Sequence, residues 1–148
     1  MKSKFQYDSM VSLKQPREAV FNFFSDAMNL EKLTPPWLHF KILTPMPIKI
    51  DEGTLIDYRL KIHGLPVRWR TEIVSWEPPF RFVDMQLRGP YRTWVHEHRF
   101  LETESGTSMI DTVSYDVLGG RLIDRFFVRP DIDKVFSYRR KKIMEIFK

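Results

Sequence analysis

The pattern of hydrophobic and polar positions switches between period two and helical spacing along the chain. Strict alternation comes first, in residues 5–13, and predicts a strand with one buried face. Helical spacing follows in two short stretches. The first is expected to begin at Pro16, and the second to end before Pro35-Pro36, because the residue before a proline avoids helical angles. The pattern therefore predicts one strand followed by two short helices.

Period two then returns and holds for most of the chain. Six further runs alternate apolar and polar side chains, and glycine, proline and acidic residues separate them. These predicted strands cover residues 38–42, 56–62, 67–73, 80–86, 94–100 and 109–115. Because the connections between them are short, they predict an antiparallel meander.

The C-terminal part returns to helical spacing after Gly119-Gly120. A long helix is expected there, with a kink or restart at Pro130. Its apolar stripe consists of Ile132, Val135, Phe136, Ile143 and Phe147. The stripe needs an apolar surface, and the concave face of the twisted sheet is available. The predicted fold class is α+β: a seven-stranded antiparallel twisted sheet wrapped on a long C-terminal helix, as a single domain over residues 1–148.

Composition narrows the kind of protein. The chain has 148 residues, a formal net charge of +5 and no cysteine, so disulfides and thiolate chemistry are excluded. Its basic residues are scattered, which does not favour nucleic-acid binding. The one basic cluster is Arg139, Arg140, Lys141 and Lys142, interpreted as a solvated helix face with weak contact to anionic surfaces. No apolar run is long enough for a membrane span and the N-terminus lacks a signal core, so we predict a cytoplasmic protein without stable membrane insertion.

Residues 93–100 alternate strictly and carry the most informative side chains. One face of this predicted strand presents, in order, Trp94, His96, His98 and Phe100. The two large aromatic side chains belong against a core, so the two imidazoles between them are expected in the same partly dry space.

Matching the faces of neighbouring strands predicts what lies opposite these histidines. The predicted cross-strand pairs are His98–Asp111, His96–Val113, Trp94–Tyr115, Asp84–His96 and Gln86–Trp94. Each histidine therefore has an acid as a cross-strand neighbour. A nearby carboxylate favours the imidazolium form and burial opposes it, so both charged and neutral hydrogen-bonded pairs are compatible with the pattern.

Four interpretations of this group, which we name the histidine layer (Asp84, His96, His98 and Asp111), stay open. In the first interpretation the layer is purely structural, and in the second it is a catalytic acid–base set. In the third it is a metal site, since two histidines and a carboxylate supply three ligands. In the fourth interpretation it is the polar end of an aromatic ligand pocket. That pocket would be formed by Tyr58, Trp69, Trp94, Tyr115 and Phe126. Because the acids are expected to engage the imidazoles, we predict no metal and no other cofactor.

The order of predicted elements resembles the helix-grip fold of the START-like superfamily, which includes polyketide cyclases, plant Bet v 1-type ligand carriers and coenzyme Q-binding proteins. More locally, several motifs resemble a bacterial branch in which the domain stands alone or is fused to a nucleotide-sugar-epimerase-like domain. These motifs are Leu33-Thr34-Pro35-Pro36-Trp37, Trp76-Glu77-Pro78-Pro79, Gly89-Pro90-Tyr91 and the alternating residues of the strands around His96 and His98. No glycine-rich dinucleotide motif is present. The resemblance implies a cavity between the sheet and the last helix.

The predicted function is binding of an apolar or amphipathic, ring-containing small molecule in this cavity. The predicted ligand-binding residues are Tyr58, Trp69, Asp84, Gln86, Trp94, His96, His98, Asp111, Tyr115 and Phe126. The alternative is a cyclase or dehydratase acting on a polyketide-like or aromatic substrate, with His96, His98, Asp84 and Asp111 as candidate catalytic residues. A second alternative is a regulatory or partner-binding domain without a ligand of its own.

Overall fold

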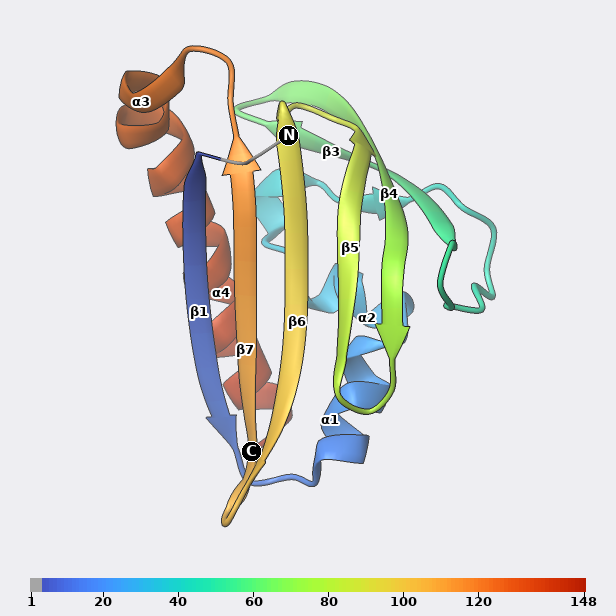
Figure 1. The fold of residues 1–148 in the computed structure, drawn as a ribbon. Helices are drawn as coiled ribbons and strands as arrows, with labels where there is room; N and C mark the ends of the chain where they lie inside the picture. Colours follow the sequence, from blue (N-terminus) through green and yellow to red (C-terminus); the bar gives the residue numbers. More distant parts are fainter. Residues whose placement is uncertain (1–3) are drawn as a thin grey trace.

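The computed structural model describes residues 4–148, in which one twisted antiparallel sheet carries helices on one face (Figure 1). The strands are β1 (Phe5–Leu13), β2 (Lys41–Ile42), β3 (Leu55–Ile62), β4 (Leu65–Glu77), β5 (Arg81–Arg88), β6 (Thr93–Thr103) and β7 (Gly106–Asp116). Over these described residues they form a seven-stranded sheet in the order β1-β7-β6-β5-β4-β3-β2. The meander runs from β2 to β7, and β1 pairs with β7. The predicted sheet is confirmed.

The two short helices after β1 are also confirmed, as α1 (Arg17–Phe24) and α2 (Met28–Leu33). The carboxylate of Asp26, which precedes the N-cap residue Ala27, accepts a hydrogen bond of 3.0 Å from the backbone N–H of Met28, the first residue of α2. The strand predicted at 38–42 is shortened to the two residues of β2. Its start is replaced by the 3₁₀ turn η1 (Pro36–Leu38), after which His39 has a positive φ of 47°.

The C-terminal helix changes its hydrogen-bond pattern directly before Pro130. It consists of α3 (Gly120–Ile123), the π-helical turn η2 (Asp124–Val128) and α4 (Arg129–Ile146), with no residue between them. A proline lacks the N–H for an intrahelical bond and its ring clashes with the carbonyl four residues earlier. The wider π turn directly before Pro130 takes up this conflict, and α4 begins at Arg129 with Pro130 in its first turn, so the interruption expected at Pro130 is present.

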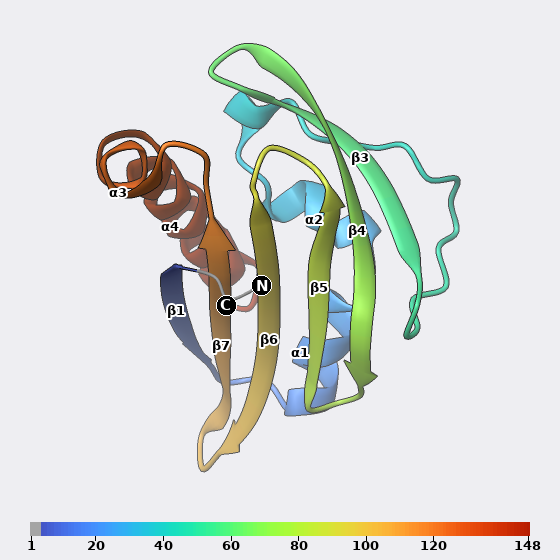
Figure 2. The same cartoon turned by 45° about the horizontal axis from the view of Figure 1, so that its top comes forward.

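The helices bury the apolar face of the sheet, and both views show them on that side (Figures 1 and 2). From α1, the ring of Phe21 lies 5.2 Å from that of Phe100 and 5.8 Å from that of Phe82. From α4, the ring of Phe136 lies 5.1 Å from that of Tyr7. These contacts close the two ends of the concave face and leave its middle, around β3 to β6, for the site described below.

A buried hydrogen bond fixes the start of the C-terminal helix on the sheet. The hydroxyl of Tyr115, at the end of β7, donates to Asp124 in η2 over 2.6 Å, and both side chains are buried. We expect Tyr115→Phe to destabilise the protein by about 1–3 kcal/mol in urea unfolding, because Asp124 keeps its burial and loses this donor.

Tyr7→Phe is the matched control for this prediction. In the unchanged protein the hydroxyl of Tyr7 donates to Asp133 over 2.8 Å. Because Asp133 is exposed, water can replace the lost donor. The free energy of unfolding should fall clearly less than in Tyr115→Phe. Equal losses in the two variants would show that the burial of Asp124 does not decide the cost.

Candidate functional site

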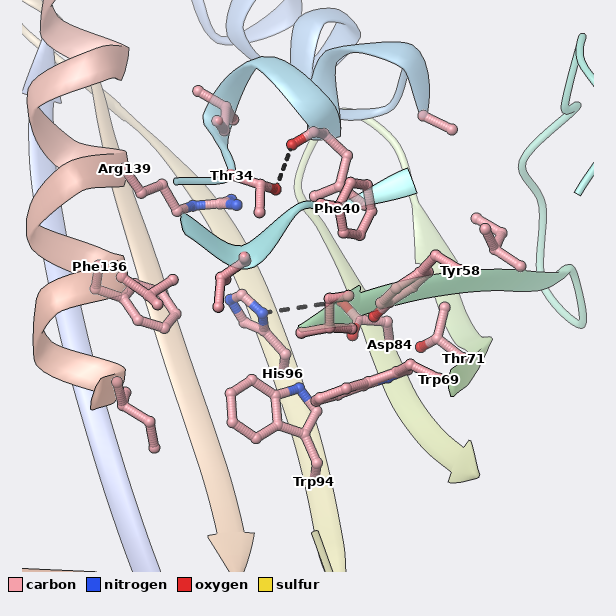
Figure 3. Close-up of a pocket in the computed structure, with 18 of the residues that line it drawn as sticks. Thr34, Phe40, Tyr58, Trp69, Thr71, Asp84, Trp94, His96, Phe136 and Arg139 are labelled. Carbon is pink, nitrogen blue, oxygen red and sulfur yellow. Dashed lines mark hydrogen bonds and ion pairs between the residues drawn. The ribbon is translucent and has the colours of Figure 1, made fainter. Parts of the chain in front are cut away.

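A cavity of about 750 Å³ lies between the inner face of the sheet, the α2–η1 segment and α4. Figure 3 shows its two contrasting surfaces, an aromatic wall from β3, β4 and β6 and a polar end that faces α4. The volume suits a small organic molecule.

The aromatic wall is built from three of the predicted residues. The rings of Tyr58 and Trp69 stack at 5.8 Å with 18° between their planes, and Trp94 meets Trp69 edge-on at 5.3 Å. Burial raises the pKa of the Tyr58 hydroxyl far above its ordinary value, and the charge of Asp84 adds to the effect. The phenol is therefore neutral. The indole N–H of Trp69 is buried and has no hydrogen-bond partner among the described residues.

Four of the predicted ligand-binding residues do not line the cavity: Gln86, Asp111, Tyr115 and Phe126. Gln86 bonds through its amide to the backbone of Tyr91, and Asp111 lies behind the histidines. Tyr115 is fully buried against Asp124.

Phe126 is 61% exposed on the outer side of η2. The buried side of this helical end runs through Asp124, Val128 and Ile132, at spacings of four residues, and this puts Phe126 on the opposite side. Phe126 therefore does not line the pocket, contrary to the prediction from the sequence.

The registers around the histidine layer agree with the prediction. His98 pairs with Asp111, His96 with Val113, Trp94 with Tyr115 and Asp84 with His96. The β5–β6 ladder ends at Met85 and Val95, so the predicted Gln86–Trp94 pair lies just beyond it.

The short hydrogen bonds of the layer join diagonal neighbours and not the residues that lie directly opposite each other. Nε2 of His96 lies 2.8 Å from Oδ1 of Asp111, and Nε2 of His98 lies 2.7 Å from Oδ2 of Asp84. The acid directly opposite each histidine is farther away, at 4.0 Å for His96 and Asp84 and 3.3 Å for His98 and Asp111. Side chains in a strand lean along its direction, so a long imidazole reaches the diagonal acid. The two imidazoles stack at 3.7 Å.

Arg139 of α4 completes the layer and was not predicted as a site residue. It lines the cavity, is 8% exposed, and its Nη2 lies 3.8 Å from Oδ1 of Asp111. Its Nε has no hydrogen-bond partner among residues 4–148. The interpretation of residues 139–142 as a solvated face is therefore wrong for Arg139. Helical spacing indicates the burial of Arg139, since positions 132, 136, 139 and 143 lie on one side of the helix.

Arg140 is also engaged, because it donates to the hydroxyl of Ser9 over 2.9 Å and to that of Ser137 over 3.1 Å. Lys142 forms an ion pair of 3.8 Å with Glu145, so three of the four residues expected to contact anionic surfaces have partners within the protein.

The charges of the layer shift one another's protonation. Burial lowers the pKa of His96, and the neighbouring His98 adds to this. Burial also opposes a charged His98, but Asp111 and Asp84 outweigh it and raise the pKa of His98. For Asp111 burial favours the neutral acid, yet Arg139 and the imidazoles hold its pKa well below the ordinary value. Asp84 behaves likewise, its pKa lowered by the imidazoles against burial. These directions favour ionised carboxylates beside the guanidinium, the protonated form of His98 and the neutral form of His96.

Asp84, His96 and His98 also place three donor atoms within 4.8 Å of one another, as a metal site requires. The imidazoles, however, stack with only 24° between their planes. Their in-plane lone pairs then run almost parallel and do not converge on one ion. Each Nε2 is already held by a carboxylate, and Arg139 adds a positive charge. The donor set fits a hydrogen-bonded layer and not a metal.

The chain belongs to the polyketide cyclase/dehydrase and lipid transport family, whose sequence model matches residues 13–137. No curated protein matches the sequence. Among the described residues no helix has the length and apolar character to cross a membrane.

Solved structures with the same fold have low sequence identity. Protein CV1439 from Chromobacterium violaceum is 13% identical, with a TM-score of 0.75 and 96% of each chain covered. The ZhuI aromatase/cyclase from Streptomyces sp. R1128 is 12% identical, with a TM-score of 0.74 over 95% of this chain and 92% of that one. Ara h 8.0201 is 12% identical, with a TM-score of 0.69 and 97% of each chain covered. These likenesses establish a shared helix-grip fold.

Proposed function

We propose that the protein binds an amphipathic, ring-containing small molecule in the cavity. The observation that carries this proposal is an aromatic wall that ends in a buried charged layer within one cavity. Flat rings favour a flat occupant because offset and edge-on aromatic contacts add about 0.5–1.5 kcal/mol each beyond burial. Membership of a family that includes cyclases and lipid transport domains supports a hydrophobic occupant.

Unpaired donors support an oxygen function on this occupant. The indole N–H of Trp69 and the Nε–H of Arg139 are buried without a hydrogen-bond partner among the described residues. A buried donor without an acceptor costs free energy, and a ligand carbonyl, hydroxyl or carboxylate would remove that cost. A saturated chain offers one carboxylate but no flat surface for Tyr58, Trp69 and Trp94.

The experiment is a calorimetric comparison of polycyclic compounds bearing a carbonyl or hydroxyl with fatty acids of similar size. We expect the ring compounds to bind more tightly by roughly tenfold or more, since two or three aromatic contacts are gained. Trp94→Ala should remove most of this preference. Phe80→Ala, which removes an exposed aromatic ring outside the cavity, should leave it unchanged. Equal affinity for fatty acids, or no binding by either class, would contradict the proposal.

A second candidate is a cyclase or dehydratase reaction in the same cavity. It is favoured by the opposite pKa shifts of the two stacked histidines, lowered for His96 and raised for His98. Such a pair supplies a base and an acid at the same pH. Turnover of a polyketide-like substrate that is lost in both His96→Gln and His98→Gln would favour the enzyme. Binding that survives both substitutions without turnover would favour the carrier.

A further inference from the structure

Residues 118–127 form the corner between β7 and the C-terminal helix. Several large apolar side chains of this segment are exposed. Leu118 is 72% exposed, Leu122 68%, Phe126 61% and Phe127 63%. We name this segment the 118–127 corner. Gly119 and Gly120 shape it with φ values of 95° and 69°, and a side chain at Gly119 would collide with Ile123. In Figure 1 the corner projects at one end of the molecule, around the label α3.

The charges of the corner all have one sign at its surface. Arg121 and Arg125 are exposed, and the guanidinium of Arg125 lies 5.6 Å above the ring of Phe126. Asp124, the acid of this segment, is buried against Tyr115. The corner thus presents arginines beside phenylalanines and leucines without an exposed carboxylate.

Two further basic residues lie at the same end of the sheet. Lys4 precedes Phe5, which pairs with Tyr115 at this end of the sheet, and Lys4 is exposed. Arg92 is exposed, and its backbone N–H donates to the carbonyl of Asp116. The carboxylate of Asp116 is buried and accepts from a backbone N–H.

We propose that the 118–127 corner docks the protein on an anionic lipid surface. Exposed apolar patches mark interaction sites, and a helix end that carries phenylalanine, leucine and arginine together fits the boundary between headgroups and acyl chains. The arginines lie where anionic headgroups would neutralise them. A stable protein interface needs complementary surfaces of roughly 800 Å² on each partner, whereas a bilayer accepts a few protruding apolar side chains beside basic ones.

The 118–127 corner lies near one end of the cavity. Nε2 of His63, in the β3–β4 turn, lies 2.7 Å from Oδ2 of Asp131, at the start of α4. Both residues line the cavity, and the side chain of His63 is exposed. Asp131 follows the corner by one helical turn, so the docked corner brings this end of the cavity close to the lipid surface. The docking itself does not depend on what the cavity binds.

The test is co-sedimentation of the full chain with vesicles of phosphatidylcholine, with and without phosphatidylglycerol. We expect binding only to the vesicles that contain phosphatidylglycerol, and weaker binding at high salt because the charges are exposed. Arg121→Gln with Arg125→Gln should weaken binding by roughly twenty-five-fold, since each arginine near an anionic surface contributes about fivefold. Phe126→Ser with Phe127→Ser should weaken it by roughly tenfold or more.

Matched controls come from exposed residues of the outer sheet face and of the turn after β1. Met10→Ser with Leu101→Ser removes apolar side chains, and Lys14→Gln with Arg99→Gln removes charges, far from the corner in sequence. Both should bind vesicles as the unchanged protein does. Three outcomes would overturn the proposal: no vesicle binding, equal loss in the controls, or self-association in sedimentation velocity that Phe126→Ser with Phe127→Ser abolishes. The last outcome would assign the corner to a second copy of the chain.

Discussion

Asp111→Asn is expected to be one of the most destabilising single substitutions in this protein, with a loss of about 3–5 kcal/mol in urea unfolding. Asp111 is 2% exposed and lies against His96, His98 and Arg139. An amide in its place keeps the size and removes the charge that balances the guanidinium. The cost follows from leaving a buried cation without its counter-charge.

The pH dependence of this loss provides the check. Because the pKa of Asp111 is held well below its ordinary value of 3.8, ionisation stabilises the folded state above that value. This contribution is lost as the pH falls through the depressed pKa. The difference between the unchanged protein and Asp111→Asn should therefore be full at neutral pH and shrink in strong acid.

Asp57→Asn is the control for Asp111→Asn. Its carboxylate forms an exposed ion pair of 2.8 Å with Arg70, so water screens it and its removal should cost far less. A loss in Asp111→Asn no larger than in Asp57→Asn would show that the layer is not held by its charges.

Arg139→Gln is expected to move a proton onto the histidine layer. In the unchanged protein Arg139 lies against Asp111, the two carboxylates raise the pKa of His98, and the pKa of His96 is lowered by burial and by His98. Without the guanidinium the two carboxylates exceed the positive charge, and His96 is the nearest group able to take up a proton. Nuclear magnetic resonance titration of the imidazole should show the pKa of His96 rising in the variant.

Arg140→Gln is the neighbouring control. Arg140 is not part of the ion pairs and hydrogen bonds of the histidine layer. It donates instead to Ser9 and Ser137. Its removal should leave the titration of His96 unchanged. If Arg139→Gln also leaves it unchanged, the guanidinium does not act on the layer and our account of its charge balance fails.

Alternation and turn residues were sufficient to predict the sheet, its register around the histidines and the long terminal helix. They succeed because a period-two pattern with one buried face allows a single register. The partners within the histidine layer were harder to predict. Register places Asp111 opposite His98, but the lean of the side chains sends the short hydrogen bond from Asp111 to His96.

Arg139 and Phe126 show the opposite errors that residue type alone produces. A charged side chain inside a basic run was expected in water, and a phenylalanine beside the sheet was expected in the pocket. Helix phase decides both cases, because Arg139 shares the stripe of Phe136 and Ile143 while Phe126 faces away. The phase around Phe126 also depends on the π turn, which no periodicity in the sequence indicates.

Pro130 sets the rotational alignment of the first helical residues relative to α4. A π turn contains one residue more than the equivalent stretch of α-helix, and one residue corresponds to roughly 100° about the helix axis. A helix with α-type bonds restored across this point would turn the segment before it by about that angle. Asp124 would then leave the side on which Tyr115 lies, and the outward direction of Phe126 and Phe127 would change with it. Pro130 lacks the N–H of an α-helical bond and so favours the π turn. Through this turn it affects the direction in which the 118–127 corner faces, although it lies outside the histidine layer.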